Sequence, residues 1–151
     1  MDNALDFTGK AVIVTGGGKG VGRGITECFL AADANVLICG RSEPEVLPHS
    51  GERKALFTSC DVRDYEQIEA CVAFAVQHFG RLDVLVNNAG YGSFGVLEAT
   101  PADKIRKQFD VNVFGLLETT KAVLPHFREN GSGVIVNISS IGGRMAFPLG
   151  T

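Results

Sequence analysis

A glycine-rich segment, TGGGKGVG at residues 15–22, is the first stretch whose residue types and spacing suggest chemistry. It directly follows the apolar run AVIVT (11–15) and precedes a segment with helical spacing. Backbone N–H groups at a helix N-terminus attract anions, and a phosphate approaches them closely only where side chains are absent. The spacing is G-x-x-x-G-x-G, not the strict G-x-G-x-x-G, so a plain structural turn is the alternative interpretation. The candidate pyrophosphate contacts are Gly16, Lys19, Gly20, Val21 and Gly22.

A second group of candidates follows the apolar run NVLIC (35–39), where the chain continues Gly40-Arg41-Ser42. In dinucleotide-binding folds an acidic residue near this point binds the ribose hydroxyls of NAD, whereas an arginine accommodates the 2′-phosphate of NADP. Gly40 places no carboxylate there, and Arg41, with Ser42 beside it, offers a cation. Lys19 adds a second one. The pattern predicts NADP in preference to NAD, with solvated surface charges as the alternative.

These candidates require strands whose carboxyl ends meet. Short runs rich in valine and isoleucine alternate with longer segments of helical spacing, which is typical of βαβ units that build a parallel sheet. The expected strands are 11–15, 35–39, 55–60, 83–87 and 133–139. Helices are expected to begin near Gly20 and Asp64, the second ending at Gly80, and a third within 101–130. The region 44–51 is expected to be a polar loop.

Bulk properties exclude several classes of protein. The 151 residues are 45% hydrophobic, which favours one folded domain, and the net charge of −3 lacks the basic excess of a nucleic-acid or anionic-membrane binder. An acidic amino terminus and the lack of a long apolar run predict no signal peptide, no membrane span and a cytoplasmic location. The four cysteines form no C-x-x-C motif, so we expect reduced, buried thiols and no metal site.

Four further motifs follow the glycine-rich segment along the chain: Asp61-Val62, NNAG (87–90), Asn112 in FDVNVFG and VNISS (136–140). Their occurrence in this order is more specific for one family than any single motif. Together with TGGGKGVG, they resemble the classical branch of the short-chain dehydrogenase/reductase family over residues 11–143. The resemblance implies a Rossmann-type, doubly wound parallel sheet with strand order 3-2-1-4-5, in one NAD(P)-binding domain of residues 1–151. It also implies that the chain is truncated before the sixth strand of the fold.

The resemblance assigns further cofactor contacts. Asp61 and Val62 match the pair that contacts the adenine ring, and Asn88-Ala89-Gly90 matches the segment under the cofactor's ribose. All of them follow the carboxyl ends of expected strands, where open α/β sheets bind ligands. A helix N-cap is the alternative interpretation for Asp61.

The resemblance also implies a catalytic arrangement. Asn112 matches an asparagine that holds a water relay, and Ser140, in preference to Ser139, matches a serine that hydrogen-bonds the substrate oxygen. The tyrosine and lysine of a Tyr-x-x-x-Lys motif are expected just beyond Thr151, since neither Tyr65 nor Tyr91 is followed by lysine four residues later. We therefore expect a C-terminally incomplete chain whose 151 residues show no activity by themselves.

The sequence thus predicts an NADP-preferring oxidoreductase that transfers hydride between the nicotinamide and a small alcohol or carbonyl substrate. The resemblance implies a homodimer or homotetramer for the full-length parent. The alternatives are a non-catalytic dinucleotide-binding or regulatory protein of the same fold, and an inactive truncated product.

Overall fold

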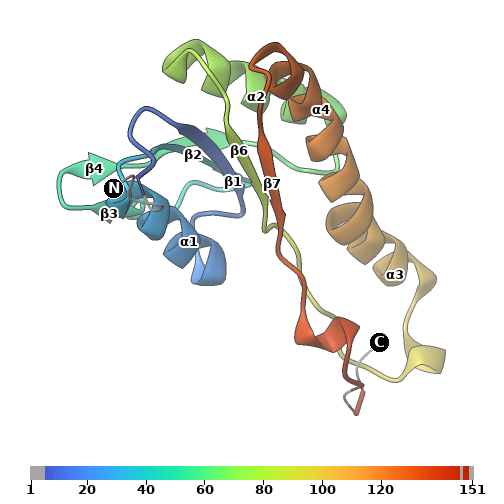
Figure 1. The fold of residues 1–151 in the computed structure, drawn as a ribbon. Helices are drawn as coiled ribbons and strands as arrows, with labels where there is room; N and C mark the ends of the chain where they lie inside the picture. The colour runs from blue at the N-terminus through green and yellow to red at the C-terminus, as the bar shows by residue number, and fades with distance from the viewer. Residues whose placement is uncertain (1–5, 147, 150–151) are drawn as a thin grey trace.

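Five parallel strands form one sheet in the computed structural model, which describes residues 6–146 and 148–149 (Figure 1). The strands are β1 (Ala11–Thr15), β2 (Asn35–Gly40), β5 (Leu56–Ser59), β6 (Val84–Asn87) and β7 (Val134–Asn137). They lie side by side in the order β5-β2-β1-β6-β7. Numbered along the five expected strands, this is 3-2-1-4-5, so the predicted parallel topology is confirmed.

The central strands β1, β2 and β6 are buried on both faces, and successive side chains of each strand point to opposite sides. In β1, Ile13 joins one apolar cluster while Val12 and Val14 join the other. The helix α1 (Gly20–Ala31) covers the second face, and α2 (Tyr65–Phe79) and α4 (Leu116–Glu129) cover the first (Figure 1). Helices on both faces make the sheet doubly wound, as predicted.

The ends of α2 follow from its sequence. Asp64 is the N-cap, and its carboxylate accepts hydrogen bonds from the N–H groups of Glu66 and Gln67. Gly80 ends the helix with φ +74°, a left-handed conformation that favours glycine. Both predicted boundaries are confirmed.

The third helical stretch is one long segment with a change of winding in its middle. It begins as α3 (Ala102–Phe109), passes through the π-helical turn η2 (Asp110–Gly115) and continues as α4. The turn brings Gly115 against Val62, so closely that an added Cβ would lie 2.8 Å from Val62 Cγ2. Such π-turns occur often at functional sites, and this one carries Asn112.

The expected polar loop at 44–51 is partly structured, so that expectation is wrong in part. His49–Ser50 (β3) and Arg53–Lys54 (β4) form a short antiparallel pair around Gly51, whose φ is +57°. Two single turns, η1 (Leu97–Ala99) and η3 (Ile141–Gly143), complete the described elements. Among the helices of residues 6–146, none is long and apolar enough to cross a membrane.

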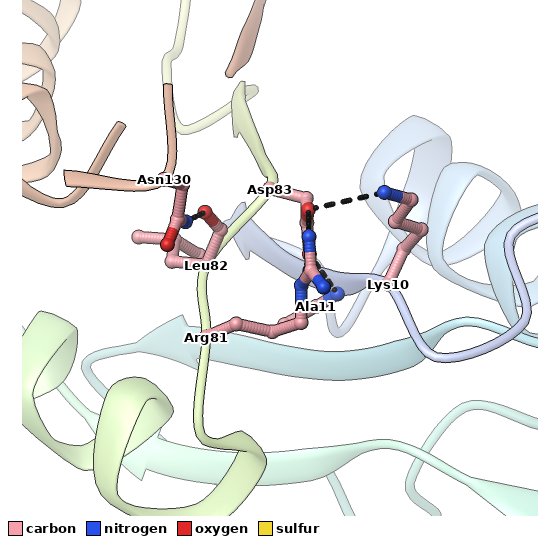
Figure 2. Close-up of polar contacts among 6 residues, drawn as sticks. All are labelled: Lys10, Ala11, Arg81, Leu82, Asp83 and Asn130. Carbon is pink, nitrogen blue, oxygen red and sulfur yellow. Dashed lines mark hydrogen bonds and ion pairs between the residues drawn. The ribbon is translucent and has the colours of Figure 1, made fainter. Parts of the chain in front are cut away.

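Asp83, just before β6, ties the amino ends of two strands together (Figure 2). Its buried carboxylate accepts hydrogen bonds from the Ala11 N–H at 2.9 Å and from Arg81 Nε at 2.7 Å. Lys10 Nζ lies 3.5 Å from the same carboxylate. Burial by itself raises the pKa of Asp83, but the bonds from Arg81 and Ala11 outweigh it, so the pKa lies below its usual value.

We expect Asp83→Asn to lower the free energy of unfolding by about 1–3 kcal/mol at pH 7. Because the folded-state pKa lies below the unfolded value of about 3.9, the stabilisation is fully present above that pH and is lost as the pH falls through the folded-state pKa. Urea unfolding of both proteins at several pH values measures the difference between their free energies of unfolding, which should disappear in acid.

The matched control for this change is Asp33→Asn. Asp33 forms an ion pair with Arg53, but its side chain is 57% exposed, so its loss should cost less than about 1 kcal/mol. A gap between the parent and Asp83→Asn that stays constant down to strongly acidic pH would contradict this role of Asp83.

Candidate functional site

A cleft of about 880 Å³ opens where β1, β2, β5 and β6 end. It is lined by the glycine-rich turn, the end of β2, the segment after β5 and the segment after β6. All predicted cofactor contacts except Gly20 line it: Gly16, Lys19, Val21, Gly22, Arg41, Ser42, Asp61, Val62, Asn88, Ala89 and Gly90. Residues predicted from four separate motifs are thus brought together in one place.

The glycine-rich turn packs closely, and the start of α1 has no side-chain cap. Gly16 has φ +65°, and a Cβ added at Gly22 would collide with Gly16 O and Asn88 Nδ2. Lys19 is the N-cap but makes no capping bond through its side chain, and the first turn contains no acidic residue. The N–H groups that begin α1 therefore face the cleft without a competing side chain. Gly20 does not line the cleft, but its φ of +51° is a left-handed conformation that favours glycine in the turn.

Thr15, which sequence analysis did not single out, joins this turn to the segment after β6. Its buried Oγ1 accepts hydrogen bonds from the N–H groups of Asn88 and Ala89, both at 3.0 Å. The Asn88 amide in turn donates to Thr15 O at 3.0 Å and to Gly16 O at 3.2 Å. The Asn88 side chain therefore holds the turn in shape. A threonine at the end of a strand, directly before the glycines, was the available signal.

Asp61 lies in the cleft wall with its charge paired. Arg63 Nε donates to both carboxylate oxygens, at 2.9 and 3.1 Å, and these bonds hold the pKa of Asp61 below its usual value. Arg63 also lines the cleft and was not predicted. The alternative interpretation of Asp61 as a helix N-cap is wrong, because Asp64 occupies that position.

Lys19 and Arg41 differ from Arg63 in this respect. Neither takes part in the ion pairs found among the described residues. Both line the cleft, and Gly40 beside Arg41 contributes no carboxylate. This wall therefore presents two positive charges that no described carboxylate pairs, next to the uncapped start of α1.

The two predicted catalytic residues lie outside the lining of the cleft. The side-chain amide of Asn112, in η2, makes two hydrogen bonds to the main chain of Tyr91. Its Nδ2 donates to Tyr91 O at 2.8 Å, and its Oδ1 accepts from Tyr91 N–H at 3.1 Å. Ser140 follows β7, and its Oγ accepts a hydrogen bond from Gly142 N–H at 3.1 Å. Both lie near the carboxyl ends of strands, on the side of the sheet where the cleft opens.

The cysteines differ from expectation at one position. All four are free thiols, and Cys39, Cys60 and Cys71 are buried, but Cys28 is exposed. Hydrogen bonds from Cys39 and Cys71 lower the pKa of Cys60, which lies at the cleft wall. The bond with Cys60 raises the pKa of Cys39 in return.

Comparisons with known proteins agree with this geometry. An L-fucose dehydrogenase of Bos taurus is 40% identical over 141 residues, covering 91% of this chain and 51% of the relative. A 2-(R)-hydroxypropyl-CoM dehydrogenase of Xanthobacter autotrophicus is 38% identical over 148 residues, covering 92% and 59%. The ligand-free Thermoplasma acidophilum aldohexose dehydrogenase superposes with a TM-score of 0.85 at 33% identity, covering 97% of this chain and 54% of that one.

The chain spans about half the length of these curated relatives. The family model described as short chain dehydrogenase matches residues 10–151, almost the whole chain. With the parallel sheet, the glycine-rich turn and the cleft in place, the chain belongs to the short-chain dehydrogenase/reductase family.

Proposed function

We propose that this chain provides the cofactor-binding part of an NADP-preferring oxidoreductase that interconverts alcohol and carbonyl groups. One observation carries the choice of cofactor: Lys19 and Arg41 line the cleft without a described carboxylate partner, while Gly40 adds no negative charge. A 2′-phosphate would gain charge-assisted bonds there, and the carboxylate of Asp61 in the same cleft is already paired with Arg63.

The rest of the cleft fits the remaining parts of a dinucleotide. The start of α1 would suit a pyrophosphate, because no side chain caps its N–H groups and its first turn holds no acidic residue. Gly16 and Gly22 keep the turn in this shape, since a side chain at either position would meet neighbouring protein atoms. Asp61 and Val62 would flank the adenine, and Ala89 and Gly90 would lie along the ribose. The bound cofactor would supply the hydride that is exchanged with the substrate carbon.

The cofactor preference is tested by exchanging the charges at the end of β2. Gly40→Asp combined with Arg41→Ala should weaken NADPH binding by about tenfold or more and bring NADH affinity above it, because the phosphate loses its cation and meets a carboxylate. Calorimetric titration with both nucleotides measures the change. Arg128→Ala, at the end of α4 and outside the cleft lining, is the matched control. Equal affinity of the parent for NADPH and NADH would refute the preference.

Alcohol and carbonyl chemistry is supported by the similar proteins, which include an L-fucose dehydrogenase, a glucose 1-dehydrogenase and a 2-(R)-hydroxypropyl-CoM dehydrogenase. Within this chain, we assign Ser140 to hydrogen bonding of the substrate oxygen. Asn112 acts as a positioning residue that keeps Tyr91 and the adjoining loop at the mouth of the cleft.

The proposed role of Ser140 gives a second test. The test uses a full-length version of the protein that is active. There, Ser140→Ala should lower kcat by about 10²–10⁴-fold. NADPH affinity should stay nearly unchanged, because the Ser140 hydroxyl lies outside the cofactor cleft. Ser139→Ala is the neighbouring control and should retain most of the activity. Equal losses in the two variants would indicate a structural role for this segment.

A further inference from the structure

Three cysteine thiols from separate elements meet beside the cleft. Cys39 lies in β2, Cys60 follows β5 and Cys71 lies in α2, and their Sγ atoms are all within 4.8 Å of one another. None of the three residues is more than 3% exposed. Cys39 and Cys60 also line the cleft, so a small ion has a short path from solvent to the sulfurs.

We propose that Cys39, Cys60 and Cys71 form a binding site for a soft, thiophilic cation, Cu(I), held by three sulfur ligands. Thiolates select soft ions such as Cu(I) and zinc over hard ions that prefer oxygen ligands. The three sulfurs form a closed triangle, since each lies close to both of the others. Three sulfur atoms arranged in this way can bind a single metal ion together.

The distances suit such an ion after a small adjustment. Metal–sulfur bonds of about 2.3 Å place three sulfurs in a trigonal plane about 4.0 Å apart. Starting from separations of up to 4.8 Å, each sulfur would move inward by at most about 0.5 Å, which side-chain rotation can supply. The three S–H protons would pass to solvent as the sulfur–metal bonds form, without any transfer of electrons.

The choice of Cu(I) over zinc rests on the number of ligands. Structural zinc is four-coordinate, and among the described residues the group contains cysteines alone. The two nearest acidic residues in sequence are engaged: Arg63 holds the Asp61 carboxylate, and the Asp64 carboxylate caps α2. The cluster is otherwise surrounded by apolar side chains, including Ile13, Ile68 and Val72. A three-coordinate ion needs no fourth ligand, and Arg41, which lines the same cleft as Cys39 and Cys60, would partly offset the negative charge of the three thiolates.

The test is an anaerobic titration of the reduced chain with Cu(I) in competition with bicinchoninate, without nucleotide, so that its outcome does not depend on the proposed function. We expect about one Cu(I) per chain to be retained and X-ray absorption to report three sulfur neighbours. Alkylation is carried out with and without Cu(I), in enough urea to expose the buried cysteines of the unloaded chain, and is followed by peptide mass mapping. It should modify Cys28 in both samples and leave the other three cysteines protected only when Cu(I) is bound.

Variants locate the ion. Cys71→Ser should weaken retention by about a hundredfold or more, because even the loss of outer-shell partners commonly costs about 10–100-fold. Cys28→Ser, at the exposed cysteine, should bind like the parent. Equal retention in both variants, two sulfur neighbours, or retention of zinc but not Cu(I) would overturn the proposal. If Cys71→Ser does not fold, the alkylation map of the unaltered chain decides, and labelling of all four cysteines in the presence of Cu(I) would overturn it.

Discussion

Replacing Gly22 by alanine should lower the free energy of unfolding by about 1–3 kcal/mol and weaken dinucleotide binding about tenfold or more. The new methyl group would collide with Gly16 O and Asn88 Nδ2. Gly16 O is a backbone atom, and Asn88 is fixed by bonds to Thr15, so neither can yield without moving the turn. A displaced turn would disturb the start of α1, where we propose that the pyrophosphate binds.

The same helix provides the control. Gly24 also lies in α1, but a Cβ added there meets nothing within 4 Å. Gly24→Ala should therefore stabilise the chain by about 0.5–1 kcal/mol through higher helix propensity and leave nucleotide affinity unchanged. Chemical denaturation and NADPH titration of the two variants compare a glycine whose added Cβ would collide with neighbours and one whose added Cβ would not. If the two variants behave alike, the close approach at Gly22 does not shape the site.

The strands and the cleft could be predicted because their signals are local. The run Ala11–Val14 is apolar, as is typical of a strand buried on both faces, and all five residues of β1 are buried. The carboxyl ends of parallel strands meet at one edge, so motifs that follow different strands had to converge. Arg63 lay outside the prediction because its place depends on its contact with Asp61.

Other features depend on tertiary contacts that no spacing encodes. The three clustered cysteines are separated by 21 and 11 residues along the chain, and only the packing of α2 on the sheet brings Cys71 to Cys39 and Cys60. The π-turn η2 likewise arises where Gly115 packs against Val62. Neither feature has a motif of the kind that identifies metal sites or helix ends.

The strand β7 differs from what its apolar sequence favours. Its residues are exposed, although VIVN suggests a buried strand. Among the described strands β7 pairs with β6 alone and forms one edge of the sheet. Val134 is 54% exposed, and the helical segment opposite adds further exposed apolar side chains, among them Phe109, Phe114 and Leu117. An apolar edge of this kind is prone to pair with another strand.

We therefore expect the 151-residue chain to self-associate through β7. Val134→Lys should raise the concentration at which the chain associates by about tenfold, because a charge on an edge strand opposes pairing. Sedimentation velocity over a range of concentrations measures the shift. Val46→Lys is the matched control: Val46 is 59% exposed, much like Val134 at 54%, lies in the loop before β3, and receives the same charge. It should associate like the parent, since the change in net charge is identical and only the position differs. A monomeric parent at all concentrations would contradict the prediction, as would a shift produced by Phe114→Lys but not by Val134→Lys, which would place the contact on the helical face.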